Sequence, residues 1–172
     1  MNFGKAGRQN GHAWALHSHG EKTTMQPRIA RVIAAGLLGT VAMTAVGVYV
    51  APMMGIPAMN PADMLAGKMG GVTMLGWMAH LMIGIVLAVV YATVFLDRIP
   101  GPVAARGAVF SVIPWLMAQM MVMPMMGVPL FSGSLAIAGG SLIGHLVYGA
   151  VMGGVTGEGV ASQPLRARAV AV

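Results

Sequence analysis

The sequence predicts an all-α membrane protein, a four-transmembrane-helix bundle built from two tandem two-helix repeats. Of its 172 residues, 57% are hydrophobic and only 8% are charged, whereas soluble domains average about 25% charged residues. Four uncharged apolar runs reach the length of a membrane span, which takes about 20 residues at 1.5 Å of rise per residue. Two short motifs also occur twice in the same order, which indicates an internal duplication.

The apolar runs define the element order. Pro52 closes the first run and Asp97 the second, and no charged residue occurs from Gly107 to Gly157. A stretch rich in Pro, Gly and Ser divides that long segment into a third and a fourth span. The predicted spans are about residues 32–50, 72–96, 103–123 and 135–156. The membrane domain is thus residues 29–157, between a flexible basic cytoplasmic tail at 1–28 and a cytoplasmic C-terminal tail at 158–172.

The basic residues predict the orientation, because Lys and Arg are retained in cytoplasmic loops. If both termini are cytoplasmic, only Lys68 among the ten Lys and Arg residues lies outside. We therefore expect a multi-pass protein of the bacterial inner membrane whose first span is an uncleaved signal anchor. The positive charge favours contact with anionic membrane lipid, and no nucleic-acid partner is expected because no basic motif with interleaved aromatic residues is present.

The first external loop contains the start of a short helix. Asn60 suits the N-cap position, Pro61 suits the first turn, and Asp63 complements the positive end of the helix dipole. We expect an interfacial helix from these residues to about Met69, where Gly70 follows.

The duplication consists of two pairs of matching segments. Pro52–Pro57 reads Pro-Met-Met-Gly-Ile-Pro and Pro124–Pro129 reads Pro-Met-Met-Gly-Val-Pro, while His80–Gly84 and His145–Gly149 both begin His-Leu and end in Gly. Because each unit holds two spans, both units have the same orientation, which predicts a parallel pseudo-two-fold axis along the membrane normal.

The fourth span carries glycines at spacings of four or five residues. Such ridges let helices approach closely, either inside the bundle or against another membrane subunit. The glycines of this ridge are Gly140, Gly144, Gly149, Gly153 and Gly157.

His80 and His145 are the histidines within the spans, and ionisable residues in a membrane are candidates for function. Counted along the helices they lie about 12 Å and about 15 Å from the outer ends, so both can approach one ligand near the repeat axis. Alternatively, each histidine forms hydrogen bonds across the bundle and only fixes the helix register. The candidate partners of that polar core are Thr44, Gln119, Ser141 and Tyr148.

Two cofactors suit paired histidines in this setting. Haem b is ligated by two imidazoles, but only Lys68 is available outside to meet its propionates. Copper(I) takes imidazole and thioether ligands, although the external turns lie about 12 Å above the histidines. The methionines of those turns are Met53, Met54, Met125 and Met126.

Three segments together carry a resemblance to a known family: Gly76–Gly84, the Pro124 turn, and His145–Gly149 with Tyr148. Over about residues 29–157 the chain resembles a family of small uncharacterised four-helix bacterial membrane proteins, designated only as a domain of unknown function. The resemblance implies the fold and an inner-membrane location, and it implies no chemistry.

The amino-acid composition excludes most classes of enzyme. The chain has no cysteine and only four acidic residues, and it lacks a catalytic triad, a His-Glu-x-x-His motif or a phosphate loop. We therefore expect no enzyme, but an accessory or assembly subunit that acts through other membrane subunits or as a homo-oligomer. The alternatives are a haem b or copper protein using His80 and His145, and a solute or ion conduit lined by these histidines with Thr44 and Gln119.

Overall fold

The computed structural model describes residues 11–160, with side chains for residues 28–157, and contains only helical elements over that range. Four continuous helical stretches are long and apolar enough to cross a membrane: Arg28–Met53, Thr73–Phe95, Val103–Met125 and Leu135–Gly157. These four helical stretches coincide with the four predicted spans to within a few residues. The elements are α1 (Gly11–Ala45), η1 (Val46–Val50), α2 (Ala51–Met53), α3 (Pro61–Lys68), α4 (Thr73–Val90), η2 (Tyr91–Phe95), α5 (Val103–Met117), η3 (Ala118–Val122), α6 (Met123–Met125), η4 (Leu130–Gly133) and α7 (Leu135–Val160).

Helix α1 starts earlier than the sequence suggested. Its helical backbone begins at Gly11, inside the segment expected to be a flexible tail at 1–28. Ala13, Ala15 and Leu16 are strong helix formers, which favours this extension of the apolar helix. The remainder of that segment, residues 1–10, and most of the C-terminal tail, residues 161–172, lie outside the described residues.

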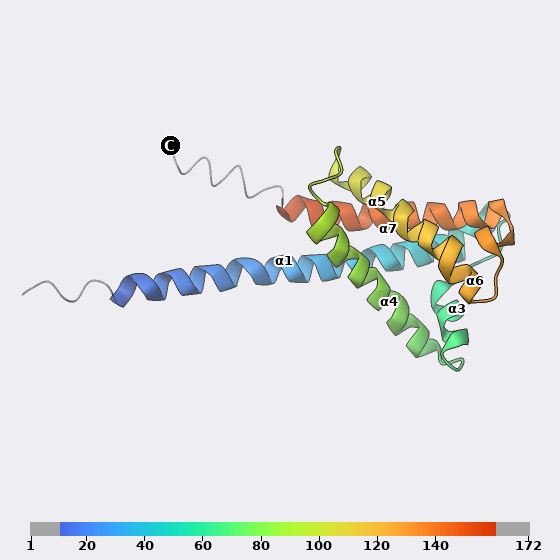
Figure 1. Ribbon diagram of the computed structural model, residues 1–172, viewed down its shortest axis with the longest axis horizontal. Helices are drawn as coiled ribbons and strands as arrows, with labels where there is room; N and C mark the ends of the chain where they lie inside the picture. Colours follow the sequence, from blue (N-terminus) through green and yellow to red (C-terminus); the bar gives the residue numbers. More distant parts are fainter. Residues whose placement is uncertain (1–10, 161–172) are drawn as a thin grey trace, which may run out of the picture.

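The span helices are arranged in the order α4, α1, α7, α5. Helix α1 packs against both α4 and α7, and α7 packs along α5. Figure 1 shows α1 and α7 running side by side, with α4 and α5 crossing them at an angle. A strict two-fold axis would require α5 to pack along α4 as α1 packs along α7, but α4 and its continuation η2 contact α5 only near one end. The predicted two-fold architecture is therefore not confirmed.

Each hairpin is held by a close crossing at glycine. In the first, Gly36 of α1 faces Gly84 of α4, where an added Cβ would overlap the Thr40 hydroxyl. In the second, Gly107 of α5 faces Gly149 of α7, where a Cβ would overlap the Gly107 carbonyl. Glycine is required at these positions because the backbones approach too closely for a side chain.

The glycine ridge of α7 is covered by other parts of the same chain. A Cβ at Gly144 would lie 3.3 Å from Cγ of Met43 on α1, and one at Gly140 would lie 2.9 Å from Cδ1 of Ile56. The other three glycines, Gly149, Gly153 and Gly157, face α5 through Gly107 and Val103. The ridge thus packs inside the bundle.

Helix α3 is present at the predicted residues. The side-chain oxygen of Asn60 accepts a hydrogen bond from the backbone amide of Ala62 at 3.0 Å, as expected of an N-cap. Gly76 of α4 lies directly against Ala62 and Ala66, which brings α3 onto the start of α4. Figure 1 shows both elements at the end where α4 leaves the bundle.

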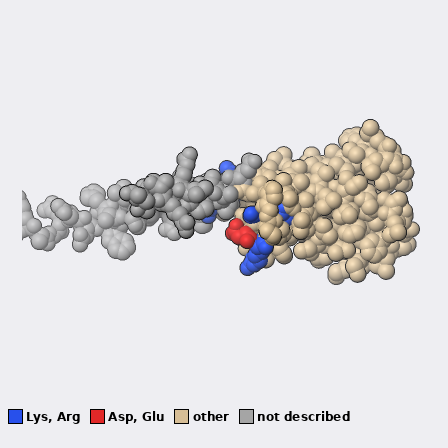
Figure 2. Space-filling view, turned by 90° about the horizontal axis from the view of Figure 1, so that it is seen from above, with Lys and Arg blue, Asp and Glu red and all other residues tan. Residues whose placement is uncertain are grey.

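An aromatic cluster joins η2, which continues α4, to α5 at the opposite end. The Phe110 ring of α5 lies 5.3 Å from Tyr91 and 5.0 Å from Phe95, between ring centroids. Charged side chains gather at this end, as Figure 2 shows. Among them, Arg106 donates hydrogen bonds to the carbonyls of Gly101 at 2.6 Å and Leu96 at 3.1 Å. Helices α4 and α5 are therefore tied together at one end and separate toward the other.

Replacing Gly149 with alanine tests the close crossing. We expect Gly149→Ala to lower stability by about 1–3 kcal/mol, the usual cost of overpacking, because its Cβ would meet the backbone of α5. Gly154→Ala on the same helix is the matched control, since a Cβ there meets nothing within 4 Å. Thermal unfolding in detergent measures both. Equal melting temperatures for the two variants would contradict the crossing.

Candidate functional site

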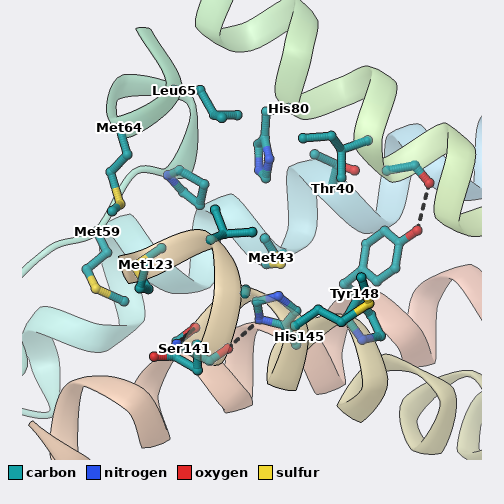
Figure 3. Close-up of a pocket in the computed structure, with 18 of the residues that line it drawn as sticks. Thr40, Met43, Met59, Met64, Leu65, His80, Met123, Ser141, His145 and Tyr148 are labelled. Carbon is teal, nitrogen blue, oxygen red and sulfur yellow. Dashed lines mark hydrogen bonds between the residues drawn. The ribbon is translucent and has the colours of Figure 1, made fainter. Parts of the chain in front are cut away.

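A cavity of about 270 Å³ lies between α4 and α5. Helices α1 and α7 form its floor through Thr40, Met43, His145 and Tyr148, and α3 borders its outer side. Figure 3 shows His80 from α4 and His145 from α7 projecting into this space from opposite sides. The cavity exists because α4 and α5 meet only near the aromatic cluster.

The His80 ring is oriented by a threonine behind it. His80 is 5% exposed, and its Nε2 lies 3.2 Å from Oγ1 of Thr44. The Thr44 hydroxyl already donates its hydrogen to the Thr40 carbonyl at 2.9 Å, so it can only accept from His80. A neutral imidazole carries one N–H and one lone pair. His80 therefore has its proton on Nε2 and its lone pair on Nδ1.

The His145 ring is oriented by its own helix. Its Nδ1 lies 2.8 Å from the backbone carbonyl of Ser141, one turn earlier on α7. Because a carbonyl only accepts hydrogen bonds, Nδ1 carries the proton and Nε2 holds the lone pair. This contact lies within the helix, not across the bundle as the purely structural interpretation expected.

Each histidine thus offers one unprotonated nitrogen. Among residues 28–157, neither Nδ1 of His80 nor Nε2 of His145 has a hydrogen-bond partner. Histidines that ligate metals show the same arrangement, in which the other ring nitrogen donates to a fixed acceptor. The pair can accept hydrogen bonds from a ligand or coordinate a metal ion.

Gln119 organises the α5 side of the cavity. It sits in η3, and its Nε2 donates to Oγ of Ser141 at 3.2 Å. The Ser132 hydroxyl donates to Oε1 of Gln119 at 2.9 Å. Ser132 and its neighbour Phe131 both have positive φ angles, 58° and 52°, which is unusual for residues other than glycine. The hydrogen bond from Ser132 to Gln119 stabilises this backbone conformation at the border of the cavity.

Tyr148 connects the floor to α4. Its hydroxyl donates to the carbonyl of Gly84 at 2.7 Å, and its ring lines the cavity beside Thr40 (Figure 3). The hydroxyl of Tyr148 is therefore hydrogen-bonded to the first crossing and not to a histidine.

The turn methionines predicted as copper ligands lie mostly outside the cavity. Met53 and Met125 are 86% and 82% exposed and Met54 is also exposed, whereas Met126 lines the cavity. Sequence analysis missed the other lining methionines, which are Met43, Met59, Met64, Met117 and Met123. Whether these methionines line the cavity depends on the order in which the helices pack, and the sequence does not indicate that order.

The lining residues suit a small soft ligand better than haem. No charged side chain among the described residues borders the cavity, so haem propionates would have no basic partner there. Its volume of about 270 Å³ lies just below the range of about 300–1,000 Å³ for small-molecule pockets, which favours a small ligand. Within the described residues, no group of three or more His, Cys, Asp or Glu side chains forms a metal site, so a metal would need thioether ligands as well.

The chain belongs to a family of unknown function, DUF6789, which matches residues 27–165. This agrees with the resemblance inferred from the repeated motifs. No similar curated protein was found, and no similar solved structure was found.

The proton positions on the two histidines can be tested directly. In ¹⁵N NMR spectra we expect His80 to be protonated on Nε2 and His145 on Nδ1. Thr44→Val should change the signals of His80 alone, because it removes the hydroxyl that accepts from Nε2. Ser141→Ala is the control: it keeps the backbone carbonyl, so the His145 tautomer should be unchanged. A wild-type His80 protonated on Nδ1 would refute the assignment.

Proposed function

We propose that the chain is a non-catalytic integral membrane protein that binds a small ligand between α4 and α5, with His80 and His145 as its recognition groups. The supporting observation is that histidines from different hairpins line one cavity, each with an unpartnered nitrogen. Ligand sites in helical bundles commonly lie between helices and combine an apolar lining with a few polar groups.

The role as an accessory or assembly subunit stays a prediction. One of its bases is the glycine ridge of α7, and that ridge faces α1, Ile56 and α5 of the same chain. A passive conduit is also less favoured, because Tyr91, Phe110 and Met152 are buried in a hydrophobic cluster toward the charged end.

We place the protein in the bacterial inner membrane with both termini in the cytoplasm. Arg28, Arg31, Arg98 and Arg106 flank the spans at one end, while Lys68 lies at the end of α3 on the other side. The positive-inside rule then makes the arginine-bearing end cytoplasmic.

We further propose that the two hairpins derive from one repeated unit. Both Pro-Met-Met-Gly turns close with the same backbone hydrogen bonds, including Ile56 to Ala51 at 3.0 Å and Val128 to Met123 at 2.9 Å. Both follow a π-helical segment, η1 or η3. The glycine crossings at Gly84 and Gly149 also match, each four residues after a histidine.

The proposed function predicts a ligand that depends on the histidines. The protein, purified from its native membrane into lipid nanodiscs, should retain a stoichiometric ligand detected by mass spectrometry of extracts and by elemental analysis. His80→Ala and His145→Ala should each lose it, because each removes one unpartnered nitrogen. Met82→Ala is the control, since Met82 is exposed on the same helix as His80 and is not a lining residue.

An empty wild-type cavity, or a ligand retained by both histidine variants, would contradict ligand binding. A stable second protein that co-purifies with an empty cavity would support the accessory-subunit role in its place.

A further inference from the structure

We propose that the ligand of this cavity is copper(I), held by the imidazoles of His80 and His145 and the thioether of Met43. Met117 of α5 and Met123 of α6 supply two further thioethers. This inference rests on the proposed function and names the ligand class of the same site.

The donor atoms select the ion. The polar groups that could ligate an ion in the cavity are imidazole, hydroxyl and amide groups. Six methionine thioethers also line it. Hard cations such as Mg²⁺ and Ca²⁺ require several oxygen ligands, usually including carboxylates, and no carboxylate lines the cavity. Thioether sulfur is a soft ligand that selects copper(I), and imidazole also suits copper.

The charge of the ion matters in an apolar site. All donors here are neutral, so a bound cation keeps its whole charge, and no described acidic side chain lines the cavity to compensate it. The desolvation cost rises with the square of the ionic charge, and it reaches several kcal/mol for a buried single charge in real proteins. A monovalent ion is therefore favoured over Zn²⁺ or copper(II).

Hydrogen bonds to neighbouring oxygen atoms hold both rings. Thr44 holds Nε2 of His80, and the Ser141 carbonyl holds Nδ1 of His145. The nitrogens that remain are both lone-pair donors, so no proton has to leave when the ion binds. Outer contacts of this kind fix ring orientation and increase ligand basicity in known metal sites.

Met43 supplies a thioether from the cavity floor. It comes from α1 on the cavity floor, is partly buried against the core, and lies between the two histidines in the view of Figure 3. Gly144, next to His145, leaves the space for it, since a Cβ there would lie 3.3 Å from Cγ of Met43. Ordinary packing also employs methionine, but it does not account for the adjacent unpartnered nitrogens.

Competition with a chromophoric copper(I) chelator tests the proposal on the full-length protein in nanodiscs under anaerobic conditions. We expect one copper(I) per chain, and X-ray absorption of the wild-type complex should show both nitrogen and sulfur neighbours. Loss of an outer contact typically lowers metal affinity by about 10–100-fold, and loss of a ligand at least as much. His80→Ala, His145→Ala and Met43→Leu should each show a decrease of that size.

Met125→Leu is the matched control, because Met125 is 82% exposed on the turn and leucine conserves the volume in both variants. Equal affinity losses in Met43→Leu and Met125→Leu would overturn the assignment, as would a wild-type spectrum without sulfur neighbours. If wild type binds no copper(I) but retains an organic ligand that the histidine variants lose, only the copper assignment fails. If no ligand of either kind depends on the histidines, the proposed function fails as well.

Discussion

The close backbone crossings at Gly84 and Gly149 are the constraint on which the rest of the structure depends. Each crossing fixes one helix against its hairpin partner, α4 on α1 and α7 on α5. His80 and His145 lie four residues before these glycines, hence about one helical turn away. The same packing that holds the bundle together therefore sets the height of both imidazoles. A side chain at either glycine would move a helix and its histidine together.

The cavity follows from the asymmetry between the two hairpins. In the first, α3 packs on the start of α4, with Gly76 against Ala62. In the second, the four residues of η4 replace such a helix. Helix α4 consequently diverges from α5 beyond the aromatic contacts of Phe110. In a fully symmetric bundle, side chains would fill the space between α4 and α5. The histidines would then face each other across a packed core.

Much of the fold was predictable because it depends on local patterns. Hydropathy located the spans, Asn60 and Pro61 located α3, and the repeated His-Leu motif located both histidines. The helix order was not predictable, since α1 carries no mark that distinguishes its contact with α4 from its contact with α7. For that reason the repeated turn motif indicated Met53 and Met125 as copper ligands. It gave no indication of Met43, which lines the same cavity as the two histidines. The hydrogen-bond partners of the histidines could not be predicted for the same reason. Thr44 was one candidate among several, and every residue has a backbone carbonyl, so the sequence does not single out that of Ser141.

Tyr148 links the two crossings and thereby limits how the cavity can change. Its hydroxyl bonds the Gly84 carbonyl, and its ring lies so close to α1 that a Cβ at Gly39 would be 2.8 Å from it. The neighbouring residue is Gly149, so one segment of α7 contacts α5, α1 and α4 together. If the space between α4 and α5 widens, the hydrogen bond between Tyr148 and Gly84 must stay in place. Breaking it would expose a hydroxyl and a carbonyl to an apolar surrounding. Adjustment to a ligand is therefore confined to the outer half of α4, the part that carries His80 and contacts α3.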